Sequence, residues 1–331
     1  MKGWLRRTLI WLLLWAMGLA GLVAFGTARP PAPAPGITAP FATLTEQGLP
    51  PLQRYRARDG AMLSYRQYPG TAPEVALLIH GSAGSSRDLH LLARALQGAG
   101  ATVLVPDLRG HGGNRPHGDI AYEGQLEDDL VDFLGAERVA LAGKPWTVLG
   151  FSSGGGFALR VAADASLGKS FERFILVSPY LRYDAPSVRQ GSSRTQNGAA
   201  GATAGQTWAA ASVGRIIGLT ILNDLGVHAW DGLPVVSFPV PGDIESATRS
   251  YSWRLQRNFG AHARYLADIK SAARPLQVLV GTADEVLDAR QLGREFASQR
   301  SDVPVILVPG VGHAGMVTSA EGIRAILGAF E

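Results

Sequence analysis

Short apolar runs alternate with amphipathic stretches along most of the chain. A continuous apolar run is typical of a strand covered on both faces, whereas apolar residues that recur every three or four positions are typical of a helix. The runs predict strands over residues 75–79, 102–105, 146–149, 174–177, 276–280 and 305–308. Two further short strands are predicted over residues 54–58 and 62–67, because Asp59-Gly60 between them is a hairpin turn signal. The amphipathic stretches predict helices over residues 88–98, 122–141, 153–165, 288–298 and 320–330. This alternation indicates an α/β fold, a mostly parallel sheet with helices on both faces.

The alternation stops between Pro179 and Pro275. So long a stretch between two strands is usually a functional insertion, which we place at about residues 181–272. Inside it, the sequence predicts a Gly/Ala/Ser/Thr-rich surface loop over 191–207, an apolar and proline-broken segment over 231–240, and helices over 213–225 and 248–267. An insertion at this point would lie over the carboxyl ends of the strands and cover whatever binds there.

The N-terminal residues have the pattern of an export signal. Lys2, Arg6 and Arg7 precede an apolar run over residues 8–26. The run is about long enough to span a bilayer, and basic residues before it orient the N-terminus towards the cytoplasm. Residues 1–28 are therefore predicted to be a signal-anchor that leaves the catalytic domain outside the cytoplasm. The alternative is a signal peptide cleaved after Ala28, which would release a secreted protein.

A proline-rich stretch follows the apolar run. Residues 29–35 read Arg-Pro-Pro-Ala-Pro-Ala-Pro, a composition that favours a stiff, extended chain. We expect residues 29–50 to be a tether and residues 51–331 to form the α/β domain. Frequent alanine, and arginine in place of lysine, are typical of bacteria with GC-rich genomes. The expected location is the periplasmic side of a bacterial inner membrane.

Composition narrows the classes of function. The chain has 331 residues, of which 46% are hydrophobic, enough for one large domain with an insertion. The net charge is +4, and no dense basic run occurs beyond the N-terminus, which argues against nucleic-acid binding. The chain contains no cysteine, which excludes disulfides, thiol catalysis and cysteine metal sites.

The most informative local motif is Gly-x-Ser-x-Gly over residues 150–154, between a predicted strand and a predicted helix. This is the context of a nucleophile elbow, in which Ser152 is held on a tight, strained turn with its hydroxyl exposed. Gly150 and Gly154 would supply the lack of bulk that the turn requires. The motif alone also fits a glycine-rich turn in which Ser152 or Ser153 caps a helix.

A serine hydroxyl needs a base to remove its proton. The histidines that follow the motif are His228, His262 and His313, and the first two fall inside the insertion. His313 follows the last predicted strand, which would bring it to the same end of the sheet as Ser152. We therefore predict His313 as the base, with a surface-loop or helix-start histidine as the alternative.

The base in turn needs an orienting carboxylate. Candidates follow the predicted strand over residues 276–280, and Asp284 is the first choice. Glu285 and Asp288 are the alternatives. Glu285 also fits a solvated neighbour, and Asp288 fits a carboxylate at the start of the next helix.

The oxyanion formed during acyl transfer needs two N–H donors. The backbone N–H of Ser153, at the start of a helix, is predicted as the first. The loop after the strand over residues 75–79 is rich in small residues, and the backbone N–H of Ser82 in this loop is predicted as the second. His80 lies beside it and is interpreted as a structural histidine that links neighbouring loops.

A further motif, Asp-x-Arg-Gly-His-Gly, occupies residues 107–112. Asp107 and His111, with His117 and Asp119 nearby, could ligate a metal, but they form no compact cluster with ligand spacing. We interpret the motif as one that shapes a loop beside the active site.

Taken in this order, the motifs over residues 80–84, 107–112, 150–154, 281–284 and 312–313 resemble the α/β-hydrolase superfamily. They are most similar to the branch that contains monoacylglycerol lipases, lysophospholipases and serine aminopeptidase-like hydrolases. The resemblance implies an eight-stranded, mostly parallel sheet, a helical cap inserted after the sixth strand, and no cofactor. One departure is Phe151 with the Gly154–Gly156 run, where the family often has His or Tyr and Met. The acyl pocket is therefore expected to differ.

The predicted function is hydrolysis of a carboxylic ester by Ser152, His313 and Asp284 through an acyl-enzyme. Aromatic residues in the insertion favour an acyl or aromatic substrate but equally fit simple packing: Trp208, Trp230, Phe238 and Trp253. A peptidase that removes an N-terminal residue is the alternative, and would need a cap carboxylate to hold the substrate amine. The candidates for that carboxylate are Asp224, Asp231, Asp243 and Glu245. A membrane-tethered binding protein without catalysis is a third hypothesis.

Overall fold

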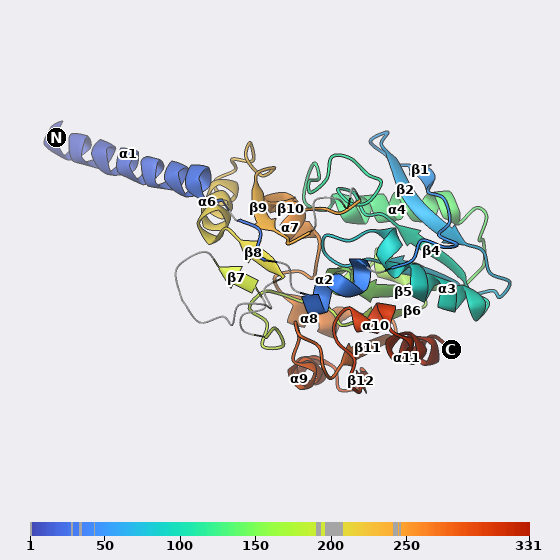
Figure 1. Cartoon of the computed structure of the whole chain (residues 1–331). Coiled ribbons are helices and arrows are strands. Elements are labelled where there is room, and N and C mark those ends of the chain that lie inside the picture. The colour runs from blue at the N-terminus through green and yellow to red at the C-terminus, as the bar shows by residue number, and fades with distance from the viewer. Residues whose placement is uncertain are drawn as a thin grey trace.

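A mixed sheet forms the centre of the computed structural model (Figure 1), which describes residues 2–27, 29–32, 35–42, 44–189, 193–195, 208–240, 244 and 246–331. Among these residues the main sheet has eight strands in the order β1-β2-β4-β3-β5-β6-β11-β12. Their bounds are β1 Gln53–Arg56, β2 Met62–Tyr68, β3 Val75–Ile79, β4 Thr102–Pro106, β5 Trp146–Phe151, β6 Arg173–Val177, β11 Leu276–Gly281 and β12 Val305–Val308. Strand β2 is antiparallel to both neighbours, and the remaining pairs are parallel. The predicted α/β sheet is confirmed.

Two hydrophobic cores cover the two faces of this sheet. Successive residues of a strand point to opposite faces, so Leu77 of β3 enters one core and Leu78 the other. Helices α3 His90–Gly98, α10 Gly315–Thr318 and α11 Ala320–Phe330 pack on one face. Helices α4 Gln125–Glu137, α5 Ser153–Ala163 and α9 Ala289–Gln299 pack on the other. Because both faces are buried, the strands need the continuous apolar runs seen in the sequence.

Two helices are shorter than predicted at their N-terminal ends. A 3₁₀ turn, Ser86–Leu89, occupies the start of the stretch assigned to α3. Helix α4 begins at Gln125 because Gly124, with φ of 103°, lies in the left-handed region that a helix cannot contain. A second 3₁₀ turn, Leu167–Ser170, links α5 to β6.

The insertion lies between β6 and β11, after the sixth strand as expected, and we call it the cap. The described residues of the cap form three helices, α6 Val213–Asp224, α7 Trp253–Asn258 and α8 Tyr265–Ser271. It also contains a small sheet that the sequence did not predict, formed by β7 Ser193–Thr195, β8 Ala209–Ala211, β9 Pro234–Ser237 and β10 Ser250–Ser252. The loop predicted over residues 191–207 lies outside the described residues, apart from β7.

The single helix predicted over residues 248–267 is wrong. Residues 250–252 pair with β9 as an edge strand, and the side chain of Ser252 then accepts a hydrogen bond from the N–H of Leu255, which starts α7. Phe259 is extended and Gly260 has φ of 148°, so the helix ends there and α8 starts later. The apolar spacing was helical, but strand pairing and capping within the cap decided the outcome.

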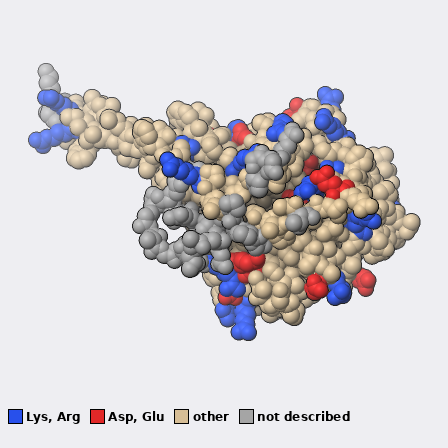
Figure 2. Space-filling view, viewed as in Figure 1, with Lys and Arg blue, Asp and Glu red and all other residues tan. Residues whose placement is uncertain are grey.

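Helix α1 (Lys2–Phe25) projects away from the rest of the molecule, with its C-terminal end beside α6 (Figure 1). It is long and apolar enough to cross a membrane, a criterion that a signal sequence also meets. In Figure 2 its positive charges lie at the far end, and the shaft between them and the domain carries none. Ala28, the predicted cleavage position, lies outside the described residues.

The stretch expected to be a tether is partly folded. Pro35–Ala42 forms helix α2, which lies against the body of the α/β domain, and Leu44 beyond it is buried. Residues 29–32 have no regular structure, whereas residues 33, 34 and 43 lie outside the described residues.

The strand order creates one point at which connections leave in opposite directions. The chain passes from β3 to β4 on one side, and β5 then lies on the other side of β3. In open parallel sheets, ligands bind at the carboxyl ends of the strands that flank such a point. The loops after β3 and β5 carry Ser82 and Ser152, so the topology puts these two serines together.

Candidate active site

Ser152 lies on a strained turn at the end of β5. Its backbone, with φ of 54° and ψ of −120°, has a conformation that residues other than glycine rarely adopt. The N–H of Ser152 donates to the carbonyl of Val177. A Cβ at Gly150 would lie 2.2 Å from the carbonyl oxygen of Gly154, and a Cβ at Gly154 would lie 2.3 Å from that of His80. Both glycines are therefore required by the close approach of backbone.

The departure at Gly156 also has a physical reason. A Cβ there would lie 2.4 Å from the carbonyl oxygen of Tyr180 and 2.7 Å from the backbone nitrogen of Ala261, which belongs to the cap. The glycine therefore allows the cap to approach the helix that follows the elbow.

Ser152, His313 and Asp284 form one hydrogen-bonded chain. Ser152 Oγ lies 2.9 Å from His313 Nε2, and His313 Nδ1 lies 2.8 Å from Asp284 Oδ2. The three side chains are buried and come from the loops after β5, β12 and β11. An imidazole that donates from Nδ1 to a carboxylate leaves Nε2 able to accept the hydroxyl proton.

Asp284 is held as a carboxylate. Burial acts to raise its pKa, but the neighbouring His313 and the N–H of Leu287 outweigh burial, so the pKa lies below its usual value. Its second oxygen accepts hydrogen bonds from the N–H groups of Val286 and Leu287, at 2.9 and 2.8 Å. The side chain is thereby fixed with one oxygen turned to the imidazole.

The two alternative acids have other partners. Asp288 caps α9, where its carboxylate accepts the N–H of Gln291 at 2.9 Å. Glu285 is more than a solvated neighbour, because its carboxylate accepts the N–H of His313 at 2.7 Å. Glu285 therefore positions the histidine loop from below while Asp284 contacts the ring.

The two other histidines considered as bases are engaged within the cap. His228 contacts Asn223 and Asp231, and its side chain is 63% exposed. His262 lies 2.9 Å from Asp268. The structure thus brings one of the three candidate histidines, His313, to Ser152.

The predicted oxyanion donors lie next to each other. The side chains of Ser82 and Ser153 share a hydrogen bond, which ties the loop after β3 to the start of α5. Within the described part of the chain, neither the N–H of Ser82 nor that of Ser153 donates to a protein acceptor. Both donors remain open for a substrate oxygen.

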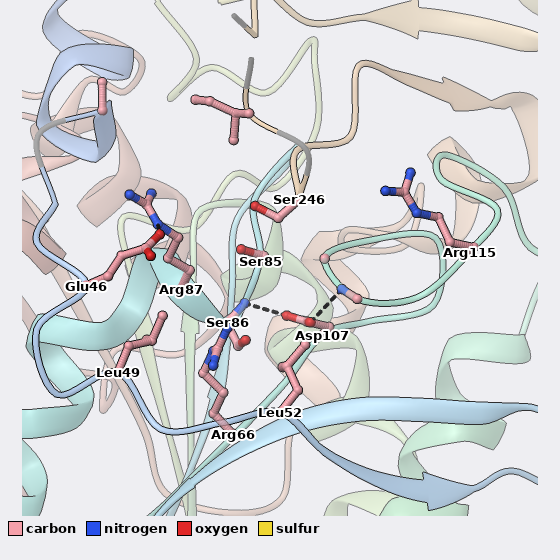
Figure 3. A pocket seen from close by; sticks show the side chains of 14 residues that line it. Glu46, Leu49, Leu52, Arg66, Ser85, Ser86, Arg87, Asp107, Arg115 and Ser246 are labelled. Atoms are coloured by element: carbon pink, nitrogen blue, oxygen red, sulfur yellow. Dashed lines mark hydrogen bonds and ion pairs between the residues drawn. The ribbon is translucent and has the colours of Figure 1, made fainter. Parts of the chain in front are cut away.

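His80 and the loop over residues 107–112 brace the site from behind. His80 is buried, contacts the carbonyl of Gly81 and accepts the N–H of Leu108, so it links two loops as expected. Burial lowers its pKa. The carboxylate of Asp107 accepts the N–H groups of Ser86 and Gly113, as Figure 3 shows. Asp107 thus shapes its loop, and no group of three potential metal ligands forms among the described residues.

Tyr251 is a neighbour of the site that the sequence analysis did not identify, because it lies in the stretch predicted as a helix over residues 248–267. Its hydroxyl accepts the N–H of Ala83 at 2.7 Å and lies 2.7 Å from His111 Nε2. Burial lowers the pKa of His111 well below its usual value, so its ring is neutral and Nε2 accepts the phenol proton. Thr248 donates its N–H to the carbonyl of Ala83. The cap therefore holds the loop that carries Ser82.

A cavity of about 180 Å³ opens onto Ser152 and His313. Its walls are mostly apolar and come from three parts of the chain, namely the body, the cap and α2. The residues of the cap and of α2 that line it are Ile37, Thr38, Ala39, Phe41, Ala42, Trp208, Phe238, Pro239, Val240, Ile244, Ser246 and Ala247. Asp88 is the one acidic residue among the described residues that line the cavity.

The peptidase hypothesis needs a cap carboxylate at this cavity. Asp231 contacts Asn223 and His228, Asp224 is exposed at the end of α6, and neither lines the cavity. Asp243 and Glu245 lie outside the described residues. The described residues therefore show no cap carboxylate that could hold a substrate amine beside Ser152.

Comparisons with known proteins agree with this architecture. A family model described as "Alpha/beta hydrolase family" matches residues 76–326. A soluble variant of monoglyceride lipase from Saccharomyces cerevisiae is similar in structure, with a TM-score of 0.65 and 19% identity over 92% of this chain and 97% of that one. A monoacylglycerol lipase from Paleococcus ferrophilus has a TM-score of 0.57 and 18% identity over 81% and 97%. An esterase from a Rhodococcus species has a TM-score of 0.55 and 19% identity over 84% and 98%. The search of curated proteins returned no match.

Proposed function

The chain belongs to the alpha/beta hydrolase family, and from this we propose that it is a serine hydrolase that cleaves carboxylic esters. The observation that carries the proposal is the hydrogen-bonded chain from Ser152 through His313 to Asp284. It supplies a nucleophile, a base and an orienting carboxylate in the arrangement that acyl transfer requires.

The proposed reaction has two steps. Ser152 Oγ attacks the ester carbonyl while His313 Nε2 takes its proton, and the N–H groups of Ser82 and Ser153 stabilise the oxyanion. His313 then gives the proton to the departing alcohol, which leaves an acyl-enzyme on Ser152. In the second step His313 takes a proton from water as the oxygen of that water attacks the acyl carbonyl, and His313 then returns the proton to Ser152 Oγ as the carboxylic acid departs. Asp284 stabilises the imidazolium in both steps.

An ester with an apolar acyl group fits the cavity better than a peptide with a free amine. The walls contributed by Trp208, Phe238 and Val240 are apolar. The carboxylate of Asp88 already accepts the N–H of Ser85 at 3.0 Å, and it belongs to the body, not to the cap. An ester with an apolar acyl group is therefore the substrate class that we propose.

We further propose that α1 is a retained membrane anchor and that the domain lies outside the cytoplasm. The guanidinium of Arg215 in the cap is buried and donates to the carbonyls of Val23, Ala24 and Pro234 at 2.8, 3.2 and 2.9 Å. Two of these acceptors are unpaired carbonyls at the C-terminal end of α1. Removal of residues 1–28 would take away both of these acceptors and the helix that covers Arg215. The intact mass of the membrane-bound protein tests this proposal, because cleavage after Ala28 would remove residues 1–28 and lower the mass accordingly.

The activity is tested with p-nitrophenyl esters of graded acyl length, using the full chain in detergent. We expect hydrolysis by the native protein and a loss of at least about 10⁴-fold in kcat for Ser152→Ala. A fluorophosphonate probe should label the native protein at one residue. Labelling should be abolished in Ser152→Ala and persist in Ser153→Ala, which removes only the neighbouring hydroxyl.

The alternatives correspond to different results. Hydrolysis of aminoacyl anilides in the absence of ester hydrolysis would support the peptidase. A folded protein that neither turns over substrates nor reacts with the probe would support the non-catalytic binding protein.

A further inference from the structure

Helix α2 forms one wall of the catalytic cavity, although it belongs to the segment between the apolar N-terminal helix and the first strand. Ile37, Thr38, Ala39, Phe41 and Ala42 line the cavity together with Ser152 and His313. The segment lies more than a hundred residues before Ser152 in the chain, outside both the cap and the matched part of the family.

The ring of Phe151 lies between Phe41 and His313. The centroid of the Phe41 ring lies 6.2 Å from that of Phe151, and the Phe151 centroid lies 5.1 Å from that of His313. Phe41 packs against the same core as Phe151, whereas Ile37 packs against the core that includes the cap. The two side chains of α2 therefore pack against different cores, and both line the cavity.

The segment is held by specific hydrogen bonds. Arg87, which follows the loop of Ser82, donates to the carbonyls of Phe41 and Leu44 at 3.3 and 3.2 Å. Its Nε donates to the carboxylate of Glu46 at 2.8 Å, and the two side chains lie side by side in Figure 3. There they form part of the wall of a second, more polar cavity of about 690 Å³. Arg87 thus fixes where α2 ends relative to the active site.

The catalytic cavity is small, so the position of the wall formed by α2 affects which substrates fit. Its volume of about 180 Å³ is below the roughly 300–1,000 Å³ typical of sites for drug-sized ligands. An apolar chain that extends from a carbonyl at Ser152 enters a cavity of which the side chains of α2 form one wall. Each methylene that can be buried in an apolar pocket raises kcat/KM by about fourfold at most, so the position of the wall sets the preferred length.

We propose that α2 determines the acyl-chain length that the enzyme accepts, with Ile37 and Phe41 as the residues that limit it. This inference rests on the proposed esterase function and names the substrate class of the same site, esters of short-chain carboxylic acids. The polypeptide that follows the membrane helix is thereby part of the specificity pocket and more than a spacer.

The test compares Phe41→Ala and Ile37→Ala with the native full chain on p-nitrophenyl esters from acetate to decanoate. Both variants remove bulk from the wall, and we expect the optimum to move to longer chains. The ratio of kcat/KM for a longer ester to that for butyrate should rise by about tenfold or more once two further methylenes are buried. Leu44→Ala is the matched control, because Leu44 is a buried side chain of the same segment that does not line the cavity.

A binding measurement makes the inference independent of turnover. Saturated fatty acids of graded length are titrated calorimetrically into Ser152→Ala, with and without Phe41→Ala. We expect the second substitution to raise the affinity for decanoate relative to butyrate. The inference would be overturned if kcat/KM and affinity depended on chain length in the same way in Phe41→Ala, in Leu44→Ala and in the protein with the native α2. A shifted binding profile without any ester hydrolysis would support the inference about α2 and remove the proposed function.

Discussion

The hydroxyl oxygen of Tyr251 lies 2.7 Å from the backbone nitrogen of Ala83, although 168 positions separate the two residues. Tyr251 belongs to the edge strand of the cap, and Ala83 follows Ser82 in the loop after β3. Ala83 has φ of 61°, an uncommon conformation for a residue with a side chain. The phenol thus holds the strained loop that carries Ser82.

Tyr251→Phe removes this hydroxyl without changing the ring. The N–H of Ala83 and Nε2 of His111 would lose a buried partner, which costs about 1–3 kcal/mol for each unsatisfied group. We expect kcat for the best ester to fall by about tenfold, with a smaller change in KM, because the oxyanion donor is misplaced.

Tyr265→Phe is the control for this prediction. The hydroxyl of Tyr265 is also buried in the cap and donates to Glu295 at 2.6 Å, away from the catalytic cavity. It should lower the melting temperature without lowering kcat of the folded protein. If both variants lost activity equally, Tyr251 would have a structural role only.

Asp284→Asn tests the choice of acid. The amide cannot stabilise the imidazolium and favours the wrong tautomer of His313, so we expect kcat to fall by about 10⁴-fold. Asp288→Asn should leave kcat unchanged, because Asn also caps α9. Glu285→Gln keeps an acceptor for the N–H of His313 and should reduce kcat by less than about tenfold. Steady-state kinetics on one ester rank the three variants, and another ranking would reassign the acid.

Gly154→Ala tests the steric basis of the elbow. The new methyl group would lie 2.3 Å from the carbonyl oxygen of His80, so the loops that carry the oxyanion donors would have to move apart. We expect the unfolding free energy to fall by about 3 kcal/mol or more. Gly328→Ala in α11 is the matched control, since nothing lies within 4 Å of a Cβ there. It should stabilise the protein by about 0.5–1 kcal/mol in denaturant unfolding.

Asp88 gives the stability a dependence on pH. Burial raises its pKa from 3.8 to about 6, so between these values the folded protein binds more protons than the unfolded chain. Stability therefore falls as the pH rises through this window and stays lower above it. Asp88→Asn should remove this loss, so the variant should gain stability relative to the native protein from acidic to neutral pH.

Asp288 provides a control of the opposite sign. The N–H of Gln291 lowers its pKa, so its contribution to stability is present above the unfolded pKa and lost as the pH falls. Asp288→Asn should therefore lose stability relative to the native protein from acidic to neutral pH. Denaturant midpoints on both sides of the window measure both variants, and parallel curves for native protein and Asp88→Asn would contradict the assignment.

If α1 is retained as a membrane anchor, specific residues of the cap should contact the bilayer. Leu19 and Val23 of α1 pack on α6, and apolar residues near the end of α6 remain exposed, among them Leu225 and Trp230. Because the chain has no cysteine, a single cysteine can be introduced and labelled without background. A polarity-sensitive dye at Leu225→Cys, in full-length protein reconstituted in nanodiscs, should shift to the blue and be quenched by doxyl lipids.

The same dye at Val139→Cys is the control, since Val139 is 85% exposed beyond α4 on the hydrolase body. It should report water. Equal, water-like emission at both positions would mean that the cap stands clear of the membrane.

The sequence by itself determined the parts of this protein that depend on local chemistry. The apolar runs specify buried parallel strands because both faces of the sheet are covered, and Gly150 and Gly154 indicate the elbow because the turn leaves no room for a Cβ. The order of Ser152, Asp284 and His313 along the chain, each after a strand, was enough to predict that they meet. Parallel strands bring their carboxyl ends to one edge of the sheet.

The tertiary structure decided whatever depends on partners that are distant in sequence. Spacing alone left Asp284, Glu285 and Asp288 open, and the hydrogen bond to His313 Nδ1 separates them. Residues 248–267 have a helical apolar pattern, yet pairing with β9 turns their start into a strand and brings the phenol of Tyr251 to Ala83. A proline-rich composition predicted a tether over residues 29–50, yet residues 37–39, 41 and 42 within it line the cavity beside Ser152. Contacts between remote segments cannot be read from the hydrophobic pattern of either segment. Each segment has the same local pattern whether or not its distant partner is present.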